Sequence, residues 1–146
     1  MGKVYDEALK FKRKYSGTVA WRLKKHAKVV EEHLNPDEEV LYAFTGQRNN
    51  EFYDIVSTSV FIITNKRLLI GQKRLIFGYF LYSITPDMFN DLTVVSGLIW
   101  GKVCIDTINE KVYVSNLSKD SLDEIETKVT EYMMKEKKEY SRGLGK

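Results

Sequence analysis

Seven short runs of β-branched and aromatic residues follow one another between residues 40 and 114, and this pattern restricts the fold more than any other feature. Runs of this length and composition are typical of β-strands. We predict strands at 40–45, 57–64, 67–71, 75–84, 92–95, 98–105 and 112–114. The segments between them are rich in turn-forming residues and too short for a crossover helix, so the strands are predicted to pair antiparallel. Doubly wound α/β folds, with their nucleotide-binding switch point, are therefore excluded.

The sequence after the last strand predicts one long amphipathic helix over residues 119–140. Ser121 is followed three residues later by Glu124, which is the spacing of a reciprocal capping box. Apolar residues then recur with helical spacing at Leu122, Ile125, Val129, Tyr132 and Met133. We expect this apolar face to cover an open end of the strand layer. Residues 141–146 contain two glycines and are predicted to form a frayed tail.

Residues 1–34 form a basic head with nine Lys or Arg against four Asp or Glu. Apolar residues at helical spacing predict two short amphipathic helices, separated near Gly17 and ended before Pro36. Their charged faces form a candidate binding surface for phosphate groups, with a tryptophan among the cations. This surface consists of Lys10, Lys12, Arg13, Lys14, Trp21, Arg22, Lys24, Lys25 and Lys28. The alternative is that these are solvated helix faces whose apolar stripes dock on the strands or on a second subunit.

Few residues are suited to catalysis or to metal binding. The single cysteine, Cys104, lies between apolar residues of a predicted strand, where we expect a packed and unreactive thiol. His26 and His33 are seven residues apart on one predicted helix, about 10 Å along its axis, which is too far to bind one ion together. No phosphate-loop, dinucleotide or zinc-protease motif is present. We therefore expect no catalytic residue, no cofactor, no metal and no small-molecule substrate.

Two segments of the sequence resemble a known family. Residues 34–41 contain a Leu-x-Pro-x-Glu pattern directly before the first strand, and residues 61–70 contain a hairpin motif. The motif consists of Thr64, Asn65, Lys66, Arg67 and Leu68. Both segments look like the bacterial PH-like domains of the YokE-like group. The resemblance implies an α+β fold: a seven-stranded antiparallel PH-like barrel or sandwich within residues 35–140, capped by the C-terminal helix, with residues 1–34 as a helical extension.

The hairpin motif also has a physical explanation that requires no ligand, and we favour this structural role. Asn65 tolerates the left-handed backbone of a tight turn, and two basic residues keep an exposed turn soluble. The loop after the first strand, residues 47–54, is where lipid-binding PH domains place their cations. Here it carries one arginine against Glu51 and Asp54. This composition argues against a specific inositol-phosphate site.

The resemblance implies a non-enzymatic module that binds a protein partner or a second copy of itself. The alternative is peripheral binding to anionic membrane lipid, or to nucleic acid, through the basic head. Phe77, Tyr79, Phe80 and Tyr82 are expected in the core, with a protein-facing surface as the second interpretation. The first residues lack the apolar core of a secretory signal, so we expect a cytoplasmic protein, with peripheral membrane contact as the alternative.

Overall fold

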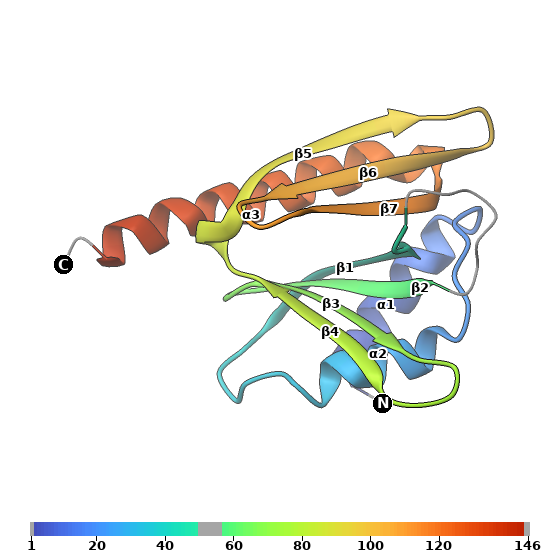
Figure 1. The fold of residues 1–146 in the computed structure, drawn as a ribbon, viewed down its shortest axis with the longest axis horizontal. Helices are drawn as coiled ribbons and strands as arrows, with labels where there is room; N and C mark the ends of the chain where they lie inside the picture. The colour runs from blue at the N-terminus through green and yellow to red at the C-terminus, as the bar shows by residue number, and fades with distance from the viewer. Residues whose placement is uncertain (1, 50–56, 145–146) are drawn as a thin grey trace.

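The structure is a computed structural model that describes residues 2–49 and 57–144. Two helices precede seven strands, and a long helix ends the chain (Figure 1). The elements are α1 (Lys3–Lys14), α2 (Leu23–Glu31), β1 (Val40–Gln47), β2 (Thr58–Thr64), β3 (Leu68–Lys73), β4 (Tyr79–Ile84), η1 (Pro86–Met88), β5 (Phe89–Ser96), β6 (Trp100–Thr107), β7 (Lys111–Ser118), η2 (Lys119–Ser121) and α3 (Leu122–Leu144). The expected α+β fold with seven antiparallel strands and a C-terminal helix is confirmed.

The seven strands form one curled sheet in the order β4-β3-β2-β1-β7-β6-β5. Within β1–β4 and within β5–β7 the strands pair along most of their length, whereas β1 and β7 pair only at Gln47 and Ser115. The sheet therefore folds into two halves that form a half-barrel (Figure 1). The predicted strand at 75–84 is shorter than expected, because Gly78 turns the chain at a φ of 69° and β4 begins only at Tyr79.

The main core lies between the two halves of the sheet and is closed by α3. Phe44 of β1 and Phe61 of β2 are fully buried, with their rings stacked at 4.7 Å between centroids. On α3, Ile125, Val129 and Met133 are buried in the same cluster. The apolar stripe predicted for the C-terminal helix thus covers the strand layer, as expected from its 3.6-residue period.

The two head helices pack on the outer face of the β1–β3 part of the sheet. Val4, Ala8, Ala27 and Val30 join β2 and β3 residues in a second buried cluster. The approach of α2 is close at Gly71 of β3, where a Cβ atom would lie 2.4 Å from a methyl carbon of Val30. The apolar stripes of both head helices therefore dock on the protein's own sheet.

The start of α3 differs in detail from the predicted capping box. The hydroxyl of Ser121 donates to the carbonyl of Ser118 at 2.7 Å, within the short helix η2. The carboxylate of Glu124 instead pairs with Lys14 of α1 and accepts from the hydroxyl of Tyr42 of β1 at 2.9 Å. Glu124 therefore joins the tail helix to the head and the sheet.

Helix α3 continues to Leu144, past the expected end at residue 140, and the last two residues of the predicted frayed tail lie outside the described residues. Within residues 2–49 and 57–144, no helix combines the length and the apolar character needed to span a membrane.

Candidate functional site

The family motif forms the β2–β3 turn and binds the segment that leads into β1. The guanidinium of Arg67 donates to both carboxylate oxygens of Glu38, from Nε at 2.9 Å and from Nη2 at 3.0 Å. The hydroxyl of Thr64 donates to the same carboxylate at 2.6 Å and accepts the backbone N–H groups of Lys66 and Arg67. A bidentate pair of this kind fixes geometry as well as charge.

The rest of the motif is also engaged in the fold. Asn65 exchanges hydrogen bonds with the backbone of Glu39: its side-chain oxygen accepts at 2.8 Å and its backbone N–H donates at 3.1 Å. Lys66 forms an exposed ion pair with Asp37 at 3.5 Å, and Leu68 is fully buried. The two segments that carry the family resemblance are therefore bonded to each other, and every residue of the motif has a structural role.

Electrostatics at this turn favour the charged form of Glu38. Burial by itself raises the pKa of Glu38, but hydrogen bonds from Arg67, Thr64 and the Asn35 amide, with the charge of Arg67, lower the pKa below its usual value. The carboxylate is therefore a fixed anion of the fold, and its partners leave no position for a ligand.

Two cations of the predicted basic surface bond to other groups of this chain. The ammonium of Lys12 donates to the carbonyls of Ser16 at 2.8 Å and Thr18 at 2.7 Å, just after the end of α1. Burial lowers the pKa of Lys12. Lys14 pairs with Glu124 of α3. Lys12 therefore bonds within the head, and Lys14, although exposed, joins the head to α3.

The remaining predicted cations lie on different parts of the surface. Lys10 lines a pocket beside α3, and Arg13 and Lys24 are exposed. The guanidinium of Arg22 lies 5.5 Å from the ring centre of Trp21, which is 44% exposed. The structure thus separates the lysines of α1 from those of α2.

Two of the α2 lysines line a pocket of about 290 Å³ beside the β3–β4 hairpin. Lys25 and Lys28 of α2 line this pocket together with Lys73 of β3. The imidazole of His33 lies within hydrogen-bond distance of the hydroxyl of Tyr79, at 3.1 Å. Glu32 lines the pocket too and pairs weakly with Lys28 at 3.7 Å, so the pocket as a whole carries positive charge.

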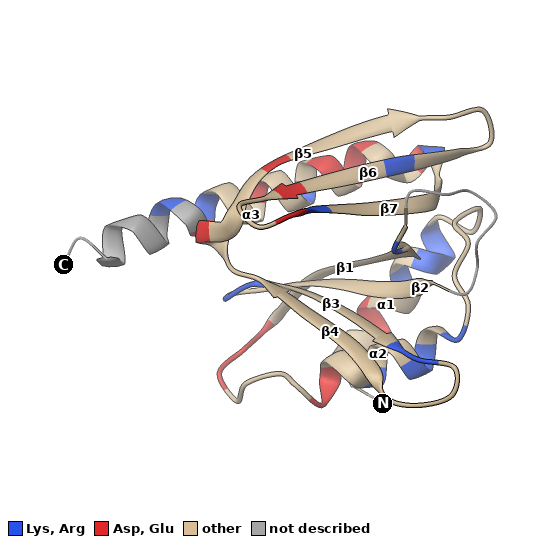
Figure 2. Ribbon diagram, in the orientation of Figure 1, with Lys and Arg blue, Asp and Glu red and all other residues tan. Residues whose placement is uncertain are grey.

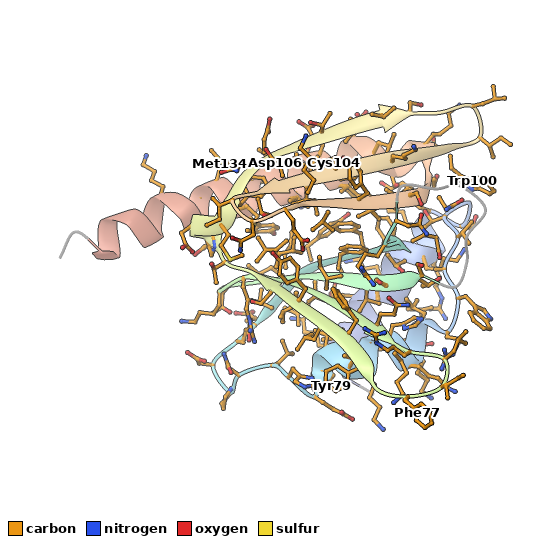
Figure 3. The ribbon with its side chains drawn as sticks, in the orientation of Figure 1. Phe77, Tyr79, Trp100, Cys104, Asp106 and Met134 are labelled. Atoms are coloured by element: carbon orange, nitrogen blue, oxygen red, sulfur yellow. The ribbon has the colours of Figure 1, made fainter. Side chains whose placement is uncertain are left out.

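Next to this pocket, the β3–β4 hairpin ends in an apolar tip, which we call the first tip: Leu75, Ile76 and Phe77. Ile76 is 81% exposed and Phe77 is 84% exposed, and Phe77 lies at the far end of the hairpin, away from the core (Figure 3). The β5–β6 hairpin carries a second tip, Leu98 and Ile99, in which Leu98 is 92% exposed. Both tips lie at the same end of the molecule (Figure 1).

Both tips stand on well-bonded bases. Below the first tip, Arg74 donates its backbone N–H to the carbonyl of Gly78 at 3.1 Å. Below the second, Lys119 donates to the carbonyl of Leu98 at 2.9 Å, and the indole of Trp100 donates to Gly17 of the head at 3.0 Å. The exposed side chains are therefore held outward by ordered backbone.

Sequence reasoning did not predict these tips as turns, because it assigned 75–84 and 98–105 to strands. It expected Phe77, Tyr79, Phe80 and Tyr82 in the core, with a protein-facing surface as the second interpretation, but Phe77 and Tyr79 are exposed and Phe80 and Tyr82 are half-buried. The first tip has a signal that identifies it in hindsight. Lys73 and Arg74 precede three apolar residues, and Gly78 follows them. A basic pair and a glycine around an apolar triplet are more typical of a turn than of a core strand.

Charge is distributed unevenly along the molecule. Lys and Arg on α1, α2 and the β3–β4 hairpin lie toward the end with the two tips (Figure 2). The Asp and Glu residues before β1, in η1 and around the β6–β7 turn lie toward the opposite end. One end of the protein thus combines exposed apolar tips with positive charge.

A buried histidine supports the first tip from below. Nδ1 of His26 accepts the backbone N–H of Lys73 at 2.8 Å, so the neutral ring carries its proton on Nε2, which has no partner among the described residues. Burial, followed by the charge of Arg22, lowers the pKa of His26 to about 4, against a smaller opposite effect of the Trp21 carbonyl. His26 is therefore neutral near pH 7 and joins α2 to the hairpin.

The other chemical candidates give no further site. Cys104 is half-buried on β6 rather than enclosed in the core as expected. In the part of the chain that the structure describes, no cluster of three or more His, Cys, Asp or Glu is arranged to hold a metal ion. Of the predicted 47–54 loop, residues 50–54 lie outside the described residues.

Two solved bacterial structures align with most of this chain. A protein with a pleckstrin-homology domain from Shewanella loihica PV-4 aligns with 83% of this chain and 98% of its own, at a TM-score of 0.50 and 16% identity. A pleckstrin homology domain from Shewanella amazonensis SB2B aligns with 77% of this chain and 89% of its own, at a TM-score of 0.49 and 17% identity. No functionally curated protein matches the chain.

The sequence profile of the family described as Bacterial PH domain matches residues 34–131. The match includes both segments of the motif, all seven strands and the first part of α3, and it leaves α1 and α2 outside. The YokE-like subgroup stays a prediction. This chain therefore belongs to the bacterial PH domain family.

Proposed function

We propose that this chain is a non-catalytic module that attaches peripherally to an anionic membrane surface. The observation that carries the proposal is the pair of exposed apolar tips, Leu75–Phe77 and Leu98–Ile99, at the end of the half-barrel where positive charge gathers. Soluble domains rarely leave such residues in water without a use for them.

The form of the tips favours a lipid layer over a protein surface. Protein interfaces of standard size bury about 800 Å² on each partner over a continuous patch. Here the exposed apolar residues stand on two separate hairpins, three on the first tip and two on the second, and short apolar tips of this kind suit insertion into the interface of a bilayer. Complete removal of a large apolar side chain from water contributes about 1.5–3 kcal/mol, so even partial insertion of Ile76, Phe77 and Leu98 supports reversible attachment.

The surrounding charges add an attraction that depends on the lipid. A Lys or Arg near an anionic leaflet contributes about 1 kcal/mol, and the effect falls off within a Debye length. Lys25, Lys28 and Lys73 line the pocket beside the first tip, and the Asp and Glu residues before β1, in η1 and around the β6–β7 turn lie toward the far end. The first tip is therefore favoured to face the anionic surface. Nucleic acid fits less well, because apolar tips gain nothing from a phosphate backbone.

Vesicle co-sedimentation tests this proposal. We expect binding to vesicles that contain about 30% phosphatidylglycerol, weaker binding to phosphatidylcholine alone, and a decrease as salt rises. The double substitution Ile76→Ser and Phe77→Ser should weaken binding at least about thirtyfold. Lys25→Gln with Lys73→Gln should weaken it less and reduce its dependence on salt.

Ile108→Ser is the matched control. Ile108 is 61% exposed on the β6–β7 turn, at the opposite end from the tips, so its substitution should leave vesicle binding unchanged. Binding that is insensitive to both the tip substitutions and the anionic lipid content would contradict the proposal.

Binding of a protein partner, or of a second copy of this chain, is the second candidate. The observation that favours it is the position of β4, which is an edge strand of the seven-stranded sheet and carries Tyr79, 49% exposed. Edge strands can accept a strand from another chain. Light scattering that shows a strict monomer at high concentration would exclude the self-association form of this candidate.

A further inference from the structure

A cleft of about 210 Å³ opens between the two halves of the half-barrel, and no residue of α3 lines it. Its walls come from the end of β1, from β3 and β4, and from the start of β7. It is lined by Arg48, Asn49, Ile70, Phe80, Tyr82, Glu110, Lys111, Val112 and Tyr113. The cleft therefore reaches the core from a side that the long helix leaves open.

Arg48, directly after β1, dominates the chemistry of this cleft. Its guanidinium carbon lies 3.9 Å from the ring centre of Phe80, which holds the planar group over the aromatic face. Nη2 donates to the neutral side-chain oxygen of Gln72 at a long 3.3 Å, and the buried Nε has no partner among the described residues. Within the described part of the chain, no carboxylate lies within ion-pair distance of Arg48.

Arg48 is half-buried, and the charged residues around it do not offset the cost of burying its positive charge. Burial is the main cause that lowers the pKa of Arg48, the charge of Arg74 lowers it further, and only Glu110 acts in the opposite direction. Lys111 adds another cation to the lining. A half-buried cation without a paired anion is unfavourable, and a bound anion would relieve that cost.

We propose that this cleft binds a small organic anion, whose carboxylate or phosphate oxygens pair with Arg48 and Lys111 and whose apolar part lies against Tyr82 and Val112. Arginine suits planar, bidentate recognition of such groups. The volume lies below the range of about 300–1,000 Å³ typical of sites for drug-sized ligands, so a metabolite-sized ligand fits. The site uses none of the tip residues and is independent of membrane attachment.

The test is an NMR titration of the full chain with two probes, benzoate for a carboxylate and inorganic phosphate for a phosphate. We expect saturable shifts of the Arg48 Nε–H signal and of β4 and β7 amides for at least one probe, with a dissociation constant in the millimolar range or lower. The probe that binds more tightly identifies the source of the anionic group.

Three variants complete the test. Arg48→Gln should weaken binding about tenfold or more, and Lys111→Gln, which removes an exposed cation at low risk to the fold, should weaken it severalfold. Lys66→Gln removes an exposed cation that does not line the cleft and should leave binding unchanged. The proposal is overturned if neither probe shifts these signals at up to about 20 mM, or if Lys66→Gln weakens binding as much as Lys111→Gln does.

Discussion

The two turns that flank β3 belong to the same sheet and differ in how their side chains are used. In the β2–β3 turn, Thr64, Asn65 and Arg67 bind the segment before β1, and Leu68 enters the core. In the β3–β4 turn, Ile76 and Phe77 extend into solvent. The first turn stabilises the fold, and the second leaves apolar surface exposed although the fold does not require it.

This difference separates the family signature from the candidate site. The motif that carries the resemblance lies in the turn whose side chains bond to the segment before β1, so its role here is structural. The turn that we propose to touch a membrane carries no residue of that motif. The motif and the proposed membrane-binding surface therefore lie on adjacent turns of one sheet.

Among substitutions in these two turns, we expect the largest change in the free energy of unfolding from Arg67→Ala in the β2–β3 turn. The side chain of Glu38 is fully buried, and removal of its partner leaves an uncompensated charge, which should lower the free energy of unfolding by about 3–5 kcal/mol. Urea denaturation measures this change. Lys66→Ala, which removes only an exposed ion pair on the same turn, should change stability by less than about 0.5 kcal/mol. Equal effects of the two substitutions would refute the structural role of the Glu38–Arg67 pair.

The second-largest expected effect is a pH dependence of stability that comes from His26, which accepts the backbone N–H of Lys73 in the β3–β4 hairpin. The pKa of His26 is about 4 in the folded state against 6.5 for an unperturbed histidine, so the unfolded state binds more protons between these values. Stability should therefore fall as pH decreases from 6.5 to 4, by a total on the order of 3 kcal/mol. His26→Gln should remove this part of the pH dependence in denaturation curves.

Below the pH range of His26, we expect a further loss of stability from protonation of Glu38, which is bonded to the β2–β3 turn. The pKa of Glu38 is lowered by its partners, so its contribution is complete above about pH 4.5 and is lost as pH falls through the folded value. This acid limb should persist in His26→Gln. A pH profile that His26→Gln leaves unchanged between 4 and 6.5 would contradict the role given to the histidine.

A smaller effect is expected for Thr64→Val, which keeps the shape of the side chain and removes its hydroxyl. The carboxylate of Glu38 loses one donor, and two backbone N–H groups of the turn lose their acceptor. We expect a loss of about 2 kcal/mol in the free energy of unfolding. A neutral result would show that water replaces the hydroxyl at this turn.

The smallest effect on stability is expected for the first tip. Ile76→Ser with Phe77→Ser removes side chains that are more than 80% exposed, so the free energy of unfolding should change by less than about 0.5 kcal/mol. The same variant should lose most of its vesicle binding. Substitutions at the first tip should therefore change binding and not stability, whereas Arg67→Ala in the β2–β3 turn should change stability. A loss of more than about 2 kcal/mol would show that the tip packs against the fold.

Much of the fold follows from local sequence patterns. Strand-forming runs and short turns predicted all seven antiparallel strands, and helical spacing predicted α1, α2 and the apolar face of α3. The errors arose where local pattern and tertiary context disagree. Leu75–Phe77 has strand composition but lies in a turn, and Glu124 has capping-box spacing but bonds to Lys14 and Tyr42.

The candidate site was harder to predict because it depends on what each residue touches. The sequence marked nine residues of the head as one basic surface, but Lys12 and Lys14 are used within the fold, and Lys25 and Lys28 lie beside Lys73 of a distant strand. A sequence shows the type and spacing of a charge, and spacing on one helix predicts a shared face. It does not show which residue of another element lies next to that charge in the folded chain.

The sequence by itself determined the number of strands, their order along the chain and their antiparallel pairing, because strand composition and turn chemistry act over a few residues. The tertiary structure decided which apolar side chains stay exposed, at the two tips, and it leaves the half-buried Arg48 without a paired carboxylate among the described residues. The physical reason is that burial and hydrogen-bond satisfaction depend on contacts between residues far apart in the chain, such as Glu38 and Arg67, and local patterns do not encode those contacts.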